Sequence, residues 1–272
     1  MDLREEDILG NNIINKDLRK RIIEIVYNAQ EGHITSSFSI IDILAYLYEN
    51  ILKFDNKKPL WEDRDYFILS KGHGCVALYV ILQKYGFITE DDLRQISSKN
   101  GILGGHPDIT KVPGVEASTG SLGHGIGTAL GVALGLRIRS RDNKVIALIG
   151  DGESNEGTVW ECALVGANLN LGNLCCIVDN NGSAAQVLPV PDMQKKWDAF
   201  GWETYVINGH SQDDIQNVFG KIKFEHNTKP KVIIANTLKG KGVSFMEGHG
   251  SWHARIPSAD EFKDALKELA DD

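Results

Sequence analysis

The sequence predicts one α/β domain in which a doubly wound, mostly parallel sheet is flanked by helices. The second half of the chain holds short apolar runs that are continuous rather than alternating, as in strands covered on both faces. Segments with helical periodicity separate them, and strand–helix–strand order favours a parallel sheet. At 272 residues the chain is long enough to bury the core of one large domain. The runs span 144–150, 174–179, 203–207 and 231–237.

The first half of the chain is predicted to be mainly helical. Residues 16–30 and 39–52 carry apolar side chains three and four positions apart, which is typical of half-buried helices. Between them, EGHITSS (31–37) is expected to form a glycine-containing turn. A short strand at 65–69 then leads into a helix at 75–85.

Capping residues and composition locate the remaining elements. Residues 101–120 contain too many glycines and prolines for a regular element, and 121–140 form a helix rich in Gly and Ala. A helix at about 155–171 joins two of the predicted strands. Three residue pairs have the spacing of a helix cap: Thr89 with Asp92, Ser211 with Asp214, and Ser258 with Glu261.

Composition and charge exclude several classes of protein. The net charge of −8 leaves no basic face for nucleic acid. The polar N-terminus lacks the apolar centre of a signal peptide, and no apolar run reaches the ~20 residues of a membrane span. We expect a soluble cytoplasmic protein forming a single domain over 1–272, with a mobile N-terminal segment of about 1–15. Its cysteines are expected to be buried thiols: Cys75, Cys162, Cys175 and Cys176.

Oxygen-bearing side chains follow two neighbouring predicted strands. Asp151 comes directly after one apolar run, and the Asn180–Asn181 pair follows the next. Ligands of open parallel sheets bind at the carboxyl ends of the strands, so the Asp carboxylate and an Asn amide oxygen could share a Mg²⁺ ion with phosphate oxygens. Gly150 and Gly152 allow tight turning and leave N–H groups for a diphosphate. A lone Gly-Asp-Gly would be a surface turn, but the second signal favours a metal–diphosphate site.

The pattern also resembles a known family. GDG…EG…E…L…LGNL…DNN is similar to the diphosphate-binding motif of thiamine-diphosphate enzymes, and specifically of transketolase. In transketolases the metal-binding Asp and Asn are thirty positions apart, which corresponds to Asp151 and Asn181. The third protein ligand is a backbone carbonyl two residues on, here that of Ser183. The resemblance implies thiamine diphosphate with Mg²⁺, or with another divalent cation such as Ca²⁺ or Mn²⁺.

Histidines are prominent in five further stretches that follow the transketolase pattern: EGHITSS, LSKGHG, GGHPD, ASTGSLGHG and LKGKGVSF…WH. Histidine can donate to a substrate oxygen, accept a hydroxyl proton and titrate near neutral pH. By resemblance, His33 and His106 contact the ketose donor, and His73 lies near the diphosphate and the reacting centre. The family's late active-site histidine is either His249 or His253.

Other positions carry the resemblance further. Gly120 and Leu122 would offer backbone contacts to the cofactor. Glu156 matches a family glutamate expected at the cofactor site and near the interface between subunits, and Glu161 matches another. His124 stands where transketolases commonly have Gln.

The resemblance extends over about residues 16–269 and covers only the N-terminal domain of a transketolase. Missing are the pyrimidine-binding domain with its activating glutamate, the arginines that grip sugar phosphate, and the C-terminal domain. After Asn181 the chain reads GSAAQVLPVPDM, where many transketolases have an isoleucine-containing segment ending in Asp-Gly. His210 and His226 match nothing in the pattern and are expected at the surface.

The sequence therefore predicts the diphosphate-binding subunit of a two-chain transketolase, which moves a two-carbon ketol unit from a ketose, expected to be phosphorylated, to an aldose. A C-terminal, pyrimidine-binding subunit would complete an α₂β₂ heterotetramer, with the helix around 123–135 facing the partner. Two alternatives stay open. One is a subunit of a pyruvate-using thiamine-diphosphate enzyme, either a dehydrogenase α-chain or an enzyme that attaches a two-carbon unit to an activated sugar. The other is a non-catalytic scaffold that binds cofactor or a partner.

Overall fold

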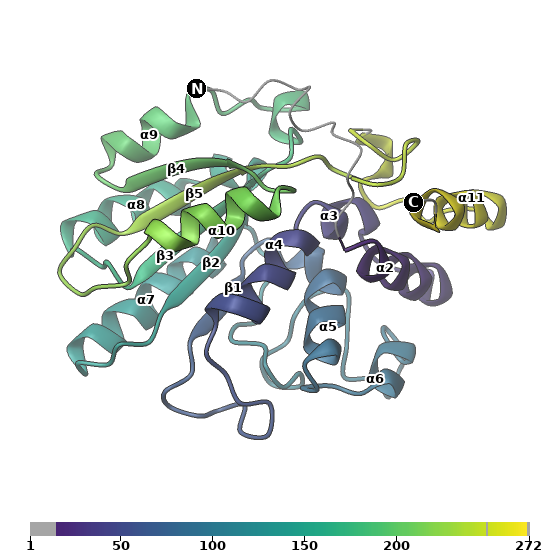
Figure 1. Cartoon of the computed structure of the whole chain (residues 1–272), viewed down its shortest axis with the longest axis horizontal. Coiled ribbons are helices and arrows are strands. Elements are labelled where there is room, and N and C mark those ends of the chain that lie inside the picture. Colours follow the sequence, from purple (N-terminus) through teal and green to yellow (C-terminus); the bar gives the residue numbers. More distant parts are fainter. Residues whose placement is uncertain (1–14, 249, 271–272) are drawn as a thin grey trace.

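The computed structural model describes residues 15–248 and 250–270, and their strands form a single five-stranded sheet (Figure 1). The strand order is β1-β2-β3-β5-β4, and every neighbouring pair is parallel. The predicted parallel α/β fold is thereby confirmed. Of the predicted mobile N-terminal segment, residues 1–14 lie outside the described part. The strands are β1 (Tyr66–Leu69), β2 (Val145–Gly150), β3 (Leu174–Asn180), β4 (Glu203–Asn208) and β5 (Lys231–Asn236).

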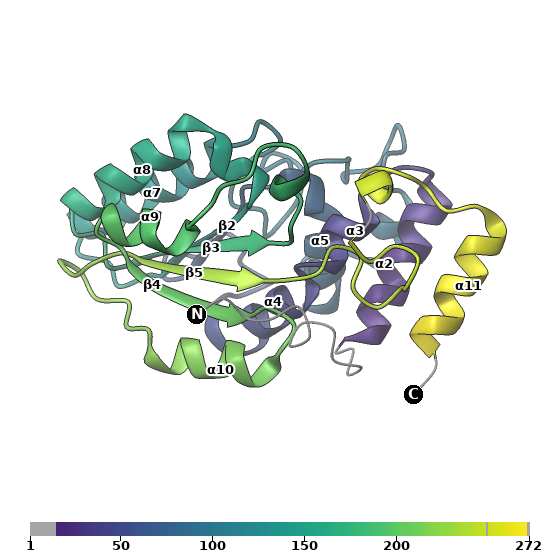
Figure 2. The ribbon, with the colours of Figure 1, turned by 90° about the horizontal axis from the view of Figure 1, so that it is seen from above.

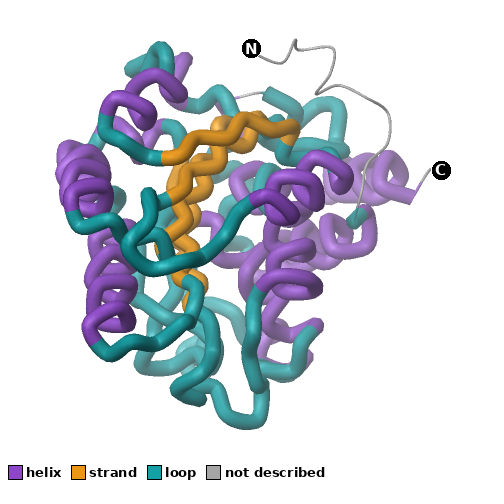
Figure 3. The backbone as a smooth tube through the Cα atoms, turned by 60° about the vertical axis from the view of Figure 1, so that its left-hand side comes forward, coloured by secondary structure: helices purple, strands orange, loops and turns teal. Residues whose placement is uncertain are grey.

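Helices cover both faces of the sheet (Figure 2 and Figure 3). One face packs against α7 (His124–Ile138), α8 (Gly157–Asn168) and α9 (Met193–Ala199). The opposite side holds α4 (Ile41–Tyr46), α5 (Cys75–Lys84) and α10 (Gln212–Lys221). Beyond α5 lie α2 (Lys16–Ala29), α3 (Ile34–Phe38) and α11 (Ala259–Ala270).

Continuous apolar sequence makes the central strands buried on both sides. Every residue of β2 is buried, with Ile146 and Leu148 in one core and Ala147 and Ile149 in the other. The small residues of α7 let this helix approach the sheet closely. A Cβ on Gly125 would lie 2.6 Å from Cα of Ser70, which directly follows β1.

The expected turn at 31–37 is partly wrong, because its second half begins helix α3. Ile34 and Phe38 stand four positions apart and are both buried, so tertiary packing stabilises one helical turn there. The helix predicted at 39–52 is α4 followed by a π-helical turn, Leu47–Ile51.

The predicted helix caps are confirmed. Thr89 and Asp92 form a capping box at the start of α6 (Glu90–Arg94). The Ser211 hydroxyl accepts a hydrogen bond from the backbone N–H of Asp214 at the start of α10. Ser258 and Glu261 exchange equivalent bonds at the start of α11.

Candidate functional site

Asp151 and the residues after β3 lie side by side at the carboxyl end of the sheet. Gly150 pairs with Asp179 in the β2–β3 register, and the Asp151 N–H donates to the Asp179 carbonyl at 3.1 Å. The N–H of Ala184 donates to Asp151 Oδ2 at 2.9 Å, which folds the loop after β3 over this carboxylate. The predicted meeting of the two strand ends is confirmed, while a role of these residues as metal ligands stays a prediction.

The Asp151 carboxylate is buried without a balancing ion pair. Only 3% of the residue is exposed, and its other oxygen accepts a hydrogen bond from the Gly152 N–H at 2.7 Å. Burial raises the pKa of Asp151 above its ordinary value, although the Ala184 amide opposes this shift. Among the described residues, no lysine, arginine or histidine forms an ion pair with it. A bound cation would stabilise the ionised form of such a carboxylate.

Asn181 is held with its amide oxygen toward the same loop. Its Nδ2 donates to Asp179 Oδ2 at 2.8 Å, and its Oδ1 accepts from the Ser183 N–H at 3.1 Å. Within the described residues no cluster of three or more His, Cys, Asp or Glu could hold a metal. A cation here would therefore combine one carboxylate with amide and carbonyl oxygens, a set that suits Mg²⁺ or Ca²⁺.

Open space adjoins Gly152. A Cβ built on this glycine would meet no atom within 4 Å, so packing within the chain does not require a glycine there. The chain turns tightly after β2 into the 3₁₀ turn Gly152–Asn155, as expected, although neither glycine needs a positive φ for it. The expectation of free N–H groups is wrong, because those of Gly150 and Gly152 donate to Glu153 and Asp151. The open space and the free approach to the backbone fit a ligand such as a diphosphate.

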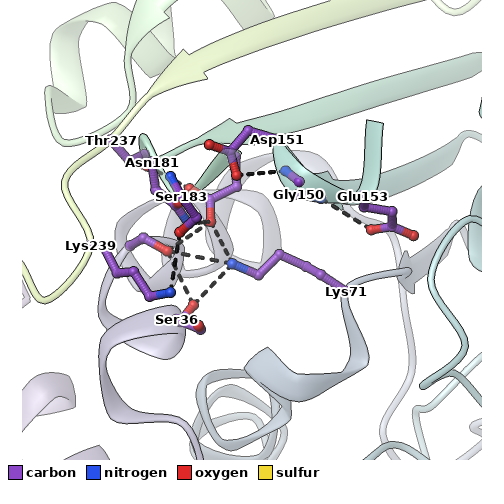
Figure 4. Close-up of polar contacts among 12 residues, drawn as sticks. Ser36, Lys71, Gly150, Asp151, Glu153, Asn181, Ser183, Thr237 and Lys239 are labelled. Carbon is purple, nitrogen blue, oxygen red and sulfur yellow. Dashed lines mark hydrogen bonds and ion pairs between the residues drawn. The ribbon is translucent and has the colours of Figure 1, made fainter. Parts of the chain in front are cut away.

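A buried ion pair adjoins these residues, and Figure 4 shows the side chain of its Lys71. Lys71 Nζ bonds to Asp179 Oδ2, and both side chains are almost fully buried. Asp179 also accepts hydrogen bonds from the hydroxyls of Ser39 at 2.7 Å and Thr237 at 2.5 Å. Burial alone would raise the pKa of Asp179, but Lys71 and the hydroxyl donors outweigh it and hold the pKa below its ordinary value. This network gives Asn181 a fixed carboxylate to donate to.

Lys239 connects the Asp151 side of the site to a histidine. Its Nζ bonds to Ser183 Oγ at 3.1 Å and to His253 Nδ1 at 2.6 Å. Burial, followed by the charge of Lys71, lowers the pKa of Lys239 to about 8. Nearby, the Lys71 ammonium donates to the Ser36 carbonyl at 3.1 Å, and the buried Ser36 hydroxyl has no partner within the described chain. An unpaired buried hydroxyl beside two ammonium groups fits an anionic ligand.

Three of the predicted histidines form a cluster. The ring of His33 lies 5.3 Å from that of His73 and 5.3 Å from that of His253, and the last two are 5.5 Å apart, centroid to centroid. Burial, then the charge of His253, lowers the pKa of His33 to about 4. Burial, then Lys71, lowers the pKa of His73 to about 2. Partial burial and Lys239 lower the pKa of His253 as well. All three imidazoles are therefore neutral at physiological pH.

His106 lies next to the segment that contains Gly120 and Leu122. His106 is exposed, and a Cβ on Gly120 would lie 3.1 Å from its Cδ2. Thr119, directly before Gly120, donates its hydroxyl to the Leu69 carbonyl at 2.7 Å, which ties the segment of Gly120 and Leu122 to the end of β1. His106 thus lies beside the predicted cofactor-contacting backbone, without a ring contact to the three clustered histidines.

Glu156 and Glu161 are exposed at the start and on the surface of α8. His124 is also exposed, at the first position of α7, and its Nδ1 bonds to the Leu122 carbonyl. His249 lies outside the described residues, so its role stays a prediction. His253, the other predicted choice, joins the cluster.

The expectation that His210 is a surface residue is wrong. Its ring is buried, with Nδ1 at 2.7 Å from Asp42 Oδ2, while Nε2 accepts the Leu238 N–H at 2.9 Å. Arg19 makes two bonds to Asp42 and donates Nε–H to the Lys241 carbonyl at 2.9 Å. The Leu238 N–H and the Lys241 carbonyl lie on either side of Lys239. Through His210 and Arg19, both are held to Asp42 of helix α4.

Sequence reasoning missed several polar residues of the site. The stretches LSKGHG and LKGKGVSF…WH contain Lys71 and Lys239, but only their histidines, His73 and His253, have expected roles. A lysine close behind an apolar strand is a usable signal. A buried ammonium is rarely left unpaired, so such a lysine predicts an anionic partner nearby. Nothing in the sequence marks Asp179 or Glu153 as a site residue, except that each lies close to the residues of the metal motif.

The arrangement brings buried oxygen-bearing side chains, two lysines and three imidazoles together at the carboxyl end of a parallel sheet. These groups could hold a metal-bound anion next to a substrate that exchanges protons. Residues 11–271 match the family described as "Transketolase, thiamine diphosphate binding domain". The chain therefore belongs to the transketolase family, which confirms the predicted family and the predicted cofactor, thiamine diphosphate.

Relatives of similar length are separate subunits. The chain is 40% identical over 258 residues to an apulose-4-phosphate transketolase subunit of Phocaeicola vulgatus, covering 93% of this chain and 91% of the relative. It is 36% identical to a 6-deoxy-6-sulfo-D-fructose transketolase subunit of Clostridium sp., covering 93% of each.

Longer transketolases contain a region similar to this chain. The Homo sapiens enzyme is 36% identical, with 88% of this chain and 38% of the human protein covered. The solved structures of transketolase from Campylobacter jejuni and Leishmania mexicana superpose with TM-scores of 0.88 and 0.87 at 29% and 26% identity. The chain covers 44% and 41% of their lengths, and 100% and 94% of it is matched. None of its described helices is long and apolar enough to span a membrane.

Proposed function

We propose that this chain is the N-terminal, diphosphate-binding subunit of a two-chain transketolase. The observation that carries the proposal is the placement of Asp151 and Asn181 on neighbouring strand ends, joined through Lys239 to the cluster of His33, His73 and His253. One end of this site has the oxygen ligands for a metal-bound diphosphate, and the other has neutral proton donors and acceptors for a sugar.

The proposed metal ligands are the Asp151 carboxylate, the Asn181 amide oxygen and the Ser183 backbone carbonyl. The donor set suits Mg²⁺, and the hydrogen bond from Asn181 Nδ2 to Asp179 directs the opposite end of the amide away from the buried carboxylate. The Lys239 ammonium and the open space at Gly152 would face the diphosphate, while the N–H groups of Gly150 and Gly152 donate to Glu153 and Asp151. The same ligand would give the buried Ser36 hydroxyl a hydrogen-bond partner.

When bound, thiamine diphosphate supplies the carbanion that makes and breaks a carbon–carbon bond next to a carbonyl. The histidines then handle protons on the sugar. Because His253 Nδ1 faces the Lys239 ammonium, the neutral ring carries its proton on Nε2 and can donate it to a substrate oxygen. His33 and His73 are neutral and can accept a hydroxyl proton, and exposed His106 is placed to contact the ketose donor.

The proposed substrates are a ketose donor and an aldose acceptor, and the names of the separate-subunit relatives point to sugars with an anionic end. The proposed partner is a pyrimidine-binding subunit in an α₂β₂ assembly. The proposed partner-facing helix, around 123–135, lies in α7, and the exposed apolar side chains of Leu164 and Val165 on neighbouring α8 support a partner-facing surface there. The single-domain organisation and the cytoplasmic location expected from the sequence remain part of this proposal.

The test is a two-chain assay. We expect the purified chain, with Mg²⁺ and thiamine diphosphate, to show no ketol transfer until a separate pyrimidine-binding subunit is added. Product analysis with both chains also separates transketolase activity from use of pyruvate. Full activity of the chain alone would refute its assignment as one of two subunits, and consumption of pyruvate with no ketose cleavage would refute the reaction.

A further inference from the structure

Glu153 is a buried carboxylate with no role in the site described above. It lies in the 3₁₀ turn Gly152–Asn155 and is 2% exposed. Its Oε2 accepts the Gly150 N–H at 3.1 Å, and its Oε1 accepts the Gly123 N–H at 2.8 Å together with the Ser70 hydroxyl. Figure 4 shows the bond to Gly150.

The two backbone groups belong to different parts of the site. Gly150 directly precedes Asp151, and Gly123 directly follows Leu122. Gly123 has φ 80°, and a Cβ there would lie 2.8 Å from Cβ of Glu156, so its conformation is closely constrained. A single side chain thus bonds to the segment that would hold the diphosphate and to the segment that would hold the remainder of the cofactor.

The bonds to Glu153 are made by neutral donors alone. No described lysine, arginine or histidine forms an ion pair with it. A buried carboxylate is costly unless every oxygen is hydrogen-bonded, and three donors from three segments satisfy this requirement together. Three hydrogen bonds to one buried side chain therefore fix the relative positions of those segments.

We propose that Glu153 is a positioning residue that sets the distance between the Gly120–Leu122 segment and the Gly150–Asp151 segment, so that one cofactor molecule can contact both. The inference rests on the proposed function, because it takes thiamine diphosphate as the molecule that bridges the two segments. Two contacts on one ligand reinforce each other only when their spacing matches the ligand.

The test compares a whole cofactor with its parts. In the full chain assembled with its partner, dissociation constants are measured by calorimetry for thiamine diphosphate, for inorganic diphosphate and for thiamine, all with Mg²⁺. We expect Glu153→Gln to weaken thiamine diphosphate roughly 10- to 100-fold, the range of a lost hydrogen bond to a charged group. Inorganic diphosphate and thiamine should each stay within about twofold of wild type, because each needs only one segment.

Two further variants control for stability. Asn173→Ala removes a buried hydrogen bond to the Ala133 carbonyl of α7, far along the helix from Gly123, and should leave all three affinities unchanged. Glu153→Asp keeps the charge but is one methylene shorter, and should weaken thiamine diphosphate as Glu153→Gln does. It also provides the test if Glu153→Gln fails to fold.

The outcomes separate this inference from the proposed function. Wild-type protein that binds neither thiamine diphosphate nor diphosphate would refute the proposed function. Wild-type binding combined with unchanged affinity in both Glu153 variants would overturn only the positioning role. Equal weakening of inorganic diphosphate and thiamine diphosphate would also overturn it, since Glu153 would then act on one segment alone.

Discussion

Replacing Asp179 by Asn should destabilise the chain more than any other single change at the site. The substitution leaves the Lys71 ammonium, 1% exposed, without its counter-ion. Breaking a buried ion pair by removing one partner costs about 3–5 kcal/mol. For a chain of this size, each kcal/mol corresponds to roughly 2–4 °C in Tm, so we expect Asp179→Asn to lower Tm by about 6–20 °C.

Differential scanning fluorimetry and urea unfolding of wild type, Asp179→Asn, Lys71→Met and the double variant provide the measurement. The double variant removes both charges and should recover much of the loss, because a buried pair replaced by uncharged groups is often close to neutral. The Lys71 ion pair lowers the pKa of Asp179, so this stability is present above the unfolded-state pKa and is lost as the pH falls through the folded-state pKa. A loss below about 1 kcal/mol, or a double variant no better than Asp179→Asn, would contradict a buried charged pair.

Two further predictions concern the histidines. His106→Ala should lower turnover about 100-fold while cofactor affinity stays nearly intact, since its proposed contact is the ketose donor; an unchanged rate with a confirmed donor would return His106 to a structural role. His33 and His73 have pKa values lowered to about 4 and about 2, so the unfolded chain takes up protons below pH ~6.5 while the folded chain does not. Stability should therefore fall from pH ~6.5 toward pH 4, and His73→Gln should flatten this fall in Tm; identical pH profiles would show that His73 is protonated equally in both states.

Much of the fold follows from local sequence. The continuous apolar runs predict the strands β1 to β5, and caps such as Thr89 predict helix starts, because both signals depend on neighbours in the chain. The neighbouring positions of Asp151 and Asn181 follow from one helix joining two parallel strands. The short helix α3 is not predicted from the sequence, because it depends on the burial of Ile34 and Phe38 in the assembled core.

The supporting network of the site could not be predicted in this way. Lys71 and Asp179 are 108 positions apart, and Ser70 and Glu153 are 83 apart. Their pairing depends on strand register and loop paths that no local pattern specifies. His210 shows the same limit, because its burial against Asp42 depends on contacts 168 positions away. The sequence therefore identifies residues that would touch the cofactor better than residues that hold them in place.

The most direct test of the metal-dependent cofactor site is calorimetric titration of thiamine diphosphate, with and without Mg²⁺, into the chain assembled with its partner. Wild type should bind only with a divalent cation. Asp151→Ala should abolish Mg²⁺-dependent binding, because it removes the one anionic protein ligand proposed for the site, and Asn181→Ala should weaken it strongly. Wild-type affinity in Asp151→Ala, or equal affinity of the wild type with and without Mg²⁺, would contradict the assignment of this site.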